Sequence, residues 1–409
     1  MSVKSPESQP SKAEFIAMMA AMMAMNAFSV DAMLPALSEM GQQLSPENPV
    51  RIQLVVILFM AGMGFGTLFT GPLSDAWGRR PVLLAGGVVY AIGALLAWMA
   101  PSLELMLAAR MLQGLGASGS RVVAMAMVRD RFSGRAMAQV TSLIITVFML
   151  FPAIAPAIGA GIIWLGGWRS IFLSFLVFSS VVMLWFGLRQ PETLAPGNRR
   201  PVRLPLIRQA LVEIVSIPMV RRTVLAMSCA FAMMLTNVSS TEMVFEHTLG
   251  LGAQFPLWFG AAAVSSLVAP IVNSRIVMRF GMHRIACWAM GGQALVSGLY
   301  LLGLKLGIVP QDQLLWYFLW MVTIFMTMGL SMGNLNAMVM EPLGHVAGIA
   351  SSLVAAISTM LGAALAIPAS ASFDGTQIPL VASIFGFMVV ARLMLVGRAF
   401  RPVSPLAAE

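Results

Sequence analysis

Long apolar runs separated by short polar segments extend along the whole chain. A helix needs about 20 mostly apolar residues to cross the hydrocarbon core of a bilayer. Twelve runs of about this length lie near residues 13–36, 51–73, 81–100, 104–126, 137–162, 170–188, 221–245, 255–277, 285–304, 314–340, 346–370 and 379–398. The pattern predicts an all-α membrane protein with one transmembrane helix for each run.

A polar stretch in the middle of the chain separates the first six runs from the last six. Residues 191–220 begin with proline and charged residues and carry little apolar periodicity. We expect two pseudo-symmetric six-helix halves, residues 1–190 and 221–409, joined by a cytoplasmic linker at 191–220. Within the linker, residues 204–216 are typical of an amphipathic helix that lies on the membrane surface.

The composition agrees with a surface that faces lipid. Hydrophobic residues make up 59% of the 409 residues and charged residues only 10%, whereas soluble domains carry about 25% charged residues. The two cysteines and three histidines show no metal-ligand spacing. No converging nucleophile, base and metal ligands indicate an enzyme. We expect neither a metal site nor a catalytic site.

The net charge of +9 comes from basic residues that gather in alternate connections between the runs. These connections include residues 79–80, 129–135, 199–208, 221–222 and 275–284. Positive residues in alternate loops orient a membrane protein so that those loops lie in the cytoplasm. We expect a bacterial inner-membrane protein with both termini in the cytoplasm and no binding to nucleic acid. For the first run, a cleaved signal peptide is the alternative.

Two loops half a chain apart repeat one pattern, a glycine followed by basic residues. The first follows the second run and reads Gly71-Pro-Leu-Ser-Asp75-Ala-Trp-Gly78-Arg79-Arg80. The second, at residues 274–284, follows the eighth run and contains Gly281. The first loop resembles the Gly-x-x-x-Asp-x-x-Gly-Arg-Arg/Lys signature of major facilitators. The resemblance implies the major facilitator fold, with a substrate cavity between two repeated halves.

The residues of this loop suit a tight turn between two helices. Gly71 and Gly78 remove side chains where backbones meet. Asp75 can accept hydrogen bonds from helix N-termini, and Arg79 and Arg80 keep the turn in the cytoplasm. In the family, this loop latches the two halves in the outward-facing state. The alternative is a basic turn that only sets the topology.

A carboxylate and an arginine lie within the apolar runs. The first run ends Phe28-Ser-Val-Asp31-Ala-Met-Leu-Pro35, which resembles the bicyclomycin-resistance (Bcr/CflA) exporters. The fourth run contains Arg110-Met-Leu-Gln113-Gly114-Leu-Gly116, similar to the family's Arg-x-x-Gln-Gly-x-Gly signature. Burial favours a protonated carboxyl group and a nearby arginine favours the charged form. We predict that Asp31 and Arg110 couple protons to transport.

Each of these two residues also has a purely structural alternative. Asp31 could cap or solvate the outer end of its helix. Arg110 could extend its guanidinium toward the membrane surface.

The fifth run carries two prolines and a glycine, Pro152, Pro156 and Gly159. It partly resembles the Gly-Pro-x-x-Gly-Gly signature of antiporters, although Ala155 and Ala160 interrupt the glycine pattern. Proline and glycine bend a helix and permit close packing. We predict a conformational role in transport, and a structural kink is the alternative.

Three residues are candidate substrate contacts. Arg121 follows Arg110 by eleven residues, which places it about 20° away around the helix and about 16 Å along it. A second cavity arginine would favour an anionic or zwitterionic substrate, unless Arg121 extends toward the cytoplasm. Gln113 lies one turn from Arg110 and could instead bond between helices. Glu242 could instead be a solvated helix end.

Further similarity to the Bcr/CflA exporters lies at residues 272–281 and 336–352. The resemblance implies a monomeric, proton-coupled efflux antiporter for small amphipathic, antibiotic-like compounds, which moves by rocker-switch alternating access. It also implies multidrug resistance, with protons as the coupling ion and no other cofactor. Export of an endogenous metabolite, such as a siderophore or amino-acid derivative, is one alternative, and proton symport for uptake is another.

Overall fold

The structure is a computed structural model that describes residues 10–199, 201, 204–397 and 400. The two termini, for which we predict a cytoplasmic position, and two arginines of the basic linker, Arg200 and Arg203, lie outside the described residues. The chain forms two compact units, Met1–Leu204 with Val238–Val264, and Pro205–Asn237 with Ser265–Glu409. The division into halves at 1–190 and 221–409 with a linker at 191–220 remains a prediction.

Every regular element in the described part of the chain is helical, which confirms the all-α fold class. The first helices are α1 (Lys12–Asp31), α2 (Leu37–Leu44), α3 (Leu54–Trp77), α4 (Arg79–Trp98), α5 (Leu103–Arg131), α6 (Gly134–Gly166) and α7 (Arg169–Arg189). The later helices are α8 (Leu204–Ser216), α9 (Pro218–Met243), α10 (Phe255–Ser265), α11 (Val268–Phe280), α12 (Met282–Lys305), α13 (Leu314–Met340), α14 (Ala347–Ala371) and α15 (Ile378–Met394). Short helical turns are η1 (Leu34–Ala36), η2 (Pro49–Gln53), η3 (Pro196–Asn198), η4 (Val244–Thr248), η5 (Gly252–Gln254) and η6 (Gly344–Val346).

Ten helical segments of the described residues are long and apolar enough to cross a membrane. The count of twelve spans therefore stays a prediction. The two predicted spans outside this set are α5 and α15. α5 is long enough at 29 residues but carries several charged side chains, and α15 is apolar but has only 17 residues.

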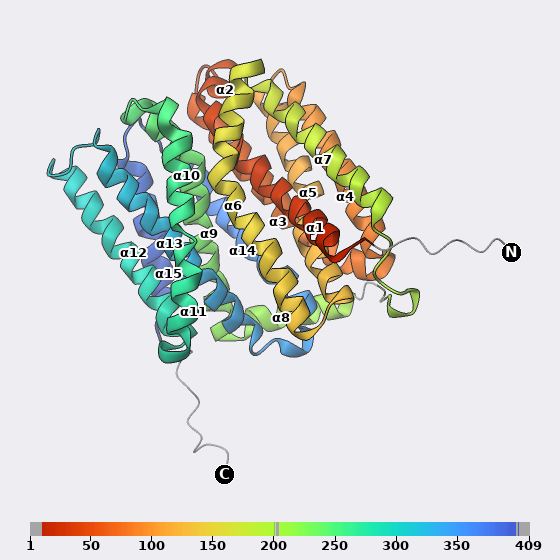
Figure 1. Ribbon diagram of the computed structural model, residues 1–409. Coiled ribbons are helices and arrows are strands. Elements are labelled where there is room, and N and C mark those ends of the chain that lie inside the picture. The colour runs from red at the N-terminus through yellow and green to blue at the C-terminus, as the bar shows by residue number, and fades with distance from the viewer. Residues whose placement is uncertain (1–9, 200, 202–203, 398–399, 401–409) are drawn as a thin grey trace, which may run out of the picture. The chain divides into compact units, whose positions relative to one another are not determined.

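In the first unit, α5 packs against α3 and α4, and Figure 1 shows the three helices side by side. Glycines permit this close approach. A Cβ atom at Gly114 would collide with the carbonyl oxygen of Phe59, and one at Gly62 would collide with that of Met111. In membranes, helices associate through such small residues because lipid provides no hydrophobic drive between them. The apolar runs thus fold around a glycine-lined interface.

The second core region of this unit lies beside the first half of α1. Phe15, Met18 and Met22 of α1 pack with buried residues of α4, α5, α6 and α7. Arg189 donates two hydrogen bonds to the carboxylate of Glu14, at 2.8 and 3.0 Å, and so fastens the end of α7 to the start of α1. The methionines of α1 are therefore core residues.

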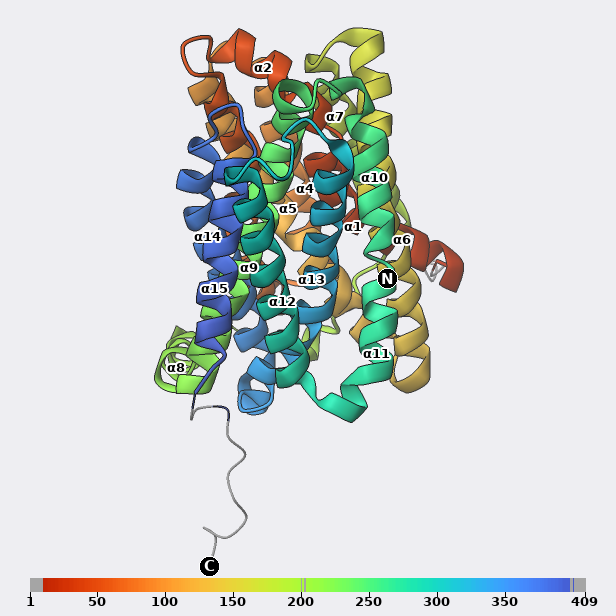
Figure 2. The ribbon, with the colours of Figure 1, turned by 90° about the vertical axis from the view of Figure 1, so that its left-hand side faces the viewer.

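In the second unit, α12 packs against α13 and α15, and Figure 2 shows these helices side by side. α8 lies crosswise to the long helices of this unit (Figure 1). It has the bounds of the predicted amphipathic helix, with Ile214 buried and Leu211 and Val215 exposed. Hydrogen bonds from Gln209 and from His345 lower the pKa of Glu213 on α8.

The two repeated loops have the same backbone geometry. Gly78 ends α3 and precedes α4 with a φ of 109°, and Gly281 ends α11 and precedes α12 with a φ of 80°. Both values lie in the left-handed region that only glycine adopts without strain. The structure therefore confirms that glycine makes the turn in both repeats.

Candidate functional site

Arg110 is the centre of a buried polar cluster in the first unit. Its side chain is fully buried, and its guanidinium lies 4.3 Å from the ring centroid of Phe59. It donates hydrogen bonds to the carbonyl of Val55 at 3.3 Å, to Oε1 of Gln113 at 2.5 Å and to the carbonyl of Ser29 at 2.9 Å. Extension of Arg110 to the membrane surface, the structural alternative, is therefore wrong.

Two further residues of this cluster were missed from the sequence. The hydroxyl groups of Ser29 and Tyr90 form a hydrogen bond with each other, and the Ser29 hydroxyl also lies 2.6 Å from the Met25 carbonyl. Tyr90 comes from α4, so the cluster joins α1, α4 and α5. The sequence did offer a signal for Tyr90, because tyrosine is rare in this chain, with three residues in 409.

Asp31 ends α1 two residues after Ser29 and is buried, with 6% of its surface exposed. It forms no ion pair with Arg110 and no hydrogen bond to any residue that the structure describes. Arg110 instead reaches the backbone of α1 at Ser29. The structure thus brings the two predicted coupling residues to one region of α1 without pairing them.

The two candidate substrate contacts on α5 have different surroundings. Gln113 is fully buried and bonds to Arg110 on its own helix, while its amide nitrogen has no hydrogen-bond partner. Arg121 is exposed and makes no ion pair or hydrogen bond within the described ranges. Between them, Ser120 donates to Oδ1 of Asn26 at 3.1 Å. Along the predicted common face of α5, Arg110 is therefore buried and hydrogen-bonded, whereas Arg121 is exposed and has no partner among the described residues.

Glu242 lies in a second buried polar cluster, at the end of α9. Only 4% of its surface is exposed, so a solvated helix end, the alternative for this residue, is wrong. Its carboxylate accepts a hydrogen bond from Ser38 of α2 at 3.1 Å. Gln53 of η2 bonds to both Ser240 and Met243, on either side of Glu242 in the sequence.

The loop between α3 and α4 contains a network of charges around Arg79. The guanidinium of Arg79 donates to Asp75 at 2.5 Å, to Ser74 at 2.7 Å and to Asp130 at 3.0 Å. Arg80 donates to the carbonyl of Gly187 at the end of α7. The loop is therefore fastened to α5 and α7, beyond what a turn that sets topology requires.

The role expected of Asp75 at a helix N-terminus belongs instead to Glu192. Its carboxylate accepts the backbone N–H groups of Arg79 and Arg80, at 3.0 and 3.1 Å, which begin α4. Asp75 lies in the last turn of α3, four residues before Arg79, and therefore reaches its side chain rather than the amides. Glu192 lies in the predicted linker, and its role was not visible in the sequence because the contact joins segments over a hundred residues apart.

Of the conformational candidates in α6, Gly159 lies close to Asp31. Pro152 and Pro156 are inside α6, and Gly159 packs so tightly against α1 that a Cβ atom would collide with the carbonyl oxygen of Ala32. Ala32 follows Asp31 directly. Gly71, by contrast, lies within α3, and its carbonyl accepts the hydroxyl of Ser74.

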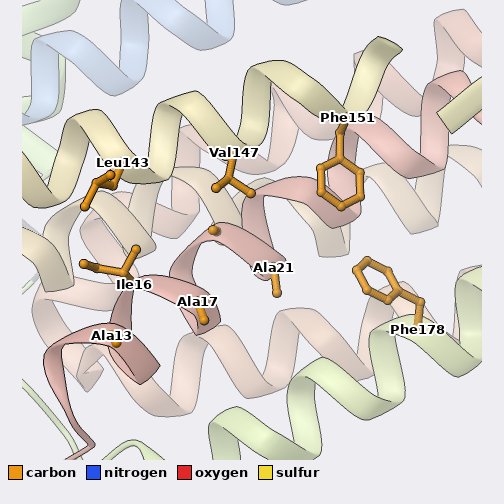
Figure 3. Close-up of a pocket in the computed structure, with 9 residues that line it drawn as sticks. Ala13, Ile16, Ala17, Ala21, Leu143, Val147, Phe151 and Phe178 are labelled. Atoms are coloured by element: carbon orange, nitrogen blue, oxygen red, sulfur yellow. The ribbon is translucent and has the colours of Figure 1, made fainter. Parts of the chain in front are cut away.

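An apolar pocket of about 500 Å³ lies between α1, α6 and α7 (Figure 3). Phe151 of α6 and Phe178 of α7 point toward one another at one end of it. A second pocket of about 470 Å³ shares these two rings and reaches Phe28, one turn before Asp31. The walls can hold the apolar part of a ligand but offer almost no polar group.

The family model of the Major Facilitator Superfamily matches residues 16–367 of this chain. The chain belongs to this superfamily. A bicyclomycin resistance protein homolog of Haemophilus influenzae is 30% identical over 373 residues, which cover 90% of this chain and 91% of that protein. A chloramphenicol resistance protein of Pseudomonas aeruginosa is 39% identical over 145 residues, 35% of this chain and 34% of that protein.

A solved structure of a D-xylose–proton symporter shares the fold, with a TM-score of 0.72 at 14% identity over 93% of this chain and 97% of that chain. Membership of the superfamily makes the protein a multi-pass membrane transporter for small molecules. Its predicted similarity to the bicyclomycin-resistance exporters is confirmed.

Proposed function

We propose that this major facilitator exports small amphipathic, antibiotic-like compounds across the bacterial inner membrane in exchange for protons. Two similar proteins are named for resistance to bicyclomycin and to chloramphenicol, which supports efflux. The protein acts by alternating access, performs no covalent chemistry, and needs protons but no other cofactor. It works as a monomer with both termini in the cytoplasm.

The observation that carries this proposal is the position of Arg110 relative to Asp31. Arg110 is a buried cation that bonds only to neutral oxygens among the described residues, one of them two residues from Asp31. A buried cation without a counter-ion is costly, and a buried carboxyl group without a donor is stable mainly when protonated or close to a cation. Small movements of α1 along α5 would therefore change whether Asp31 holds a proton.

The neighbouring elements would allow such movement of α1. Gly159 of α6 lies directly against the backbone at Ala32, so α6 and α1 touch without an intervening side chain. Pro152 and Pro156 weaken the backbone hydrogen bonding of α6 in the two turns before this contact. A bend of α6 would thus be transmitted to the end of α1 that carries Asp31.

The unpaired charge of Arg121 favours a substrate that carries a negatively charged group. It is exposed within a helix of a membrane protein and has no ion-pair partner in the described chain. A carboxylate on the substrate would compensate this charge only when bound. The same observation favours the second candidate function, export of an acidic metabolite such as a siderophore or amino-acid derivative.

Transport into proteoliposomes tests the proposal. We expect an imposed pH gradient to drive accumulation of an exported compound, and addition of that compound to move protons in the opposite direction, recorded by a trapped pH-sensitive dye. Bicyclomycin, chloramphenicol and acidic amino-acid derivatives form the first panel. Uptake that does not respond to the gradient would contradict proton exchange, and proton movement in the same direction as the compound would indicate symport.

A further inference from the structure

Gln53 is a buried glutamine that has no role in the proposed proton site. It ends η2 and has 1% of its surface exposed. Its Oε1 accepts a hydrogen bond from the Ser240 hydroxyl at 2.7 Å, and its Nε2 donates to the sulfur of Met243 at 2.9 Å. Both partners lie on the last turn of α9, which also carries Glu242.

A second polar contact fastens the same turn. Ser38 of α2 donates to the carboxylate of Glu242 at 3.1 Å. The four residues Ser38, Gln53, Ser240 and Glu242, here called the polar latch, therefore join the α1–α3 connection to the end of α9. All four belong to the first unit.

The backbone after the polar latch departs from α-helical geometry. Residues Val244–Thr248 form a turn of π-helix, in which the N–H of Leu249 donates to the carbonyl of Val244 at 3.0 Å. Single π-helical turns are rare in proteins, and those that occur often lie at functional sites. The unusual turn thus begins two residues after Glu242.

Besides small residues that pack closely, polar side chains such as serine and glutamine join helices in membranes through hydrogen bonds. They suit a contact that opens, because water can replace each hydrogen bond when the groups separate. Exchanging a hydrogen bond with water for one within the protein changes an equilibrium constant by only roughly two- to tenfold. A contact of this kind holds the closed state without making it irreversible.

We propose that the polar latch closes the end of the protein that contains α2 and η2, and that Gln53 is the positioning residue that holds Glu242 in it. This inference rests on the proposed alternating-access cycle, in which that end must open to release substrate. By the predicted topology this is the outer end, because it lies opposite the α3–α4 turn. Opening breaks the Ser38–Glu242 and Gln53–Ser240 hydrogen bonds together.

The test measures access to the turn after the polar latch. Cys229 and Cys287 are first replaced by alanine, and Val244, which is fully buried, is changed to cysteine as the reporter. A membrane-impermeant maleimide is then added outside right-side-out vesicles, and the labelling rate is measured. This readout needs neither substrate nor a pH gradient, so it can fail or succeed independently of the proposed function.

Four variants in this background separate lost hydrogen bonds from lost packing. Gln53→Met fills the same space without polar groups. Ser38→Ala removes the hydroxyl group that donates to Glu242. Ser38→Thr keeps the hydroxyl and should restore the slow rate. Gln42→Met is the matched control, since Gln42 is an exposed glutamine of α2 that makes no hydrogen bond among the described residues.

We expect Gln53→Met and Ser38→Ala each to raise the labelling rate roughly two- to tenfold, with Ser38→Thr and Gln42→Met near the parent rate. Equal rates in all variants would overturn the proposal. So would faster labelling in Ser38→Thr as well as Ser38→Ala, because the loss would then come from packing. If Gln53→Met does not fold, the two Ser38 variants decide alone.

Discussion

Removal of the Glu192 carboxylate should destabilise the first unit measurably. In the structure this side chain accepts the first two backbone N–H groups of α4, from Arg79 and Arg80, as well as the N–H groups of Thr193 and Leu194. A helix N-terminus has no acceptors of its own for these groups and carries a partial positive charge. Glu192→Ala leaves both α4 donors without their partner.

The size of the effect follows from the number of bonds and their exposure. A hydrogen bond to a charged group contributes about 1.5–3 kcal/mol when buried, and loss of an N-terminal cap costs about 0.5–2 kcal/mol. Glu192 is only half-buried, so water compensates part of the loss. We expect Glu192→Ala to lower the free energy of unfolding by about 2 kcal/mol, or roughly 4–8 °C in the unfolding midpoint for about 200 residues.

Thermal unfolding in detergent, followed by tryptophan fluorescence, measures this shift. Glu192→Gln keeps one acceptor oxygen and should lose about half as much as Glu192→Ala. The control is Glu47→Ala, which removes an exposed carboxylate that has no hydrogen bond or ion pair in the described chain. Equal midpoints for Glu192→Ala and Glu47→Ala would refute the capping role of Glu192.

Three further results are expected. Gly114→Ala should destabilise the protein by about 1–3 kcal/mol through overpacking against α3, whereas Gly161→Ala, where a Cβ atom has no neighbour within 4 Å, should not; equal unfolding midpoints would contradict the glycine interface. Arg121→Ala should weaken binding of anionic ligands much more than that of matched neutral ligands, with Arg121→Lys restoring it only partly, and equal losses would make Arg121 structural. Reporter fusions at Pro6 and Pro405 should both give cytoplasmic signals, and a periplasmic signal at either end would contradict the twelve-span topology.

The sequence predicted those features that depend on local pattern. Apolar runs located the membrane helices, and the repeated glycines located the turns at Gly78 and Gly281. The amphipathic pattern at 204–216 gave α8 with its bounds. Such features depend on periodicity and on backbone angles that only glycine adopts, both of which are visible in a single sequence.

The sequence did not predict which polar groups meet. Glu192, Tyr90 and Gln53 each act on a helix far along the chain, and their positions depend on how the helices pack. Helical spacing predicts that Arg110 and Arg121 share one face of α5, but it could not show that Arg110 is buried and Arg121 exposed. The burial of a side chain depends on which helices pack around it, whereas helical spacing gives only the direction in which the side chain points.

If Asp31 couples proton movement to export, Asp31→Asn should lose transport that is driven by a pH gradient. The comparison uses wild type and Asp31→Asn in proteoliposomes with equal amounts of folded protein, each with and without an imposed pH gradient. We expect that Asp31→Asn still exchanges labelled substrate down its own concentration gradient but accumulates none in response to the pH gradient. Accumulation by Asp31→Asn at the wild-type rate would mean that Asp31 is not the proton site, and Glu242 would be the next buried carboxylate to test.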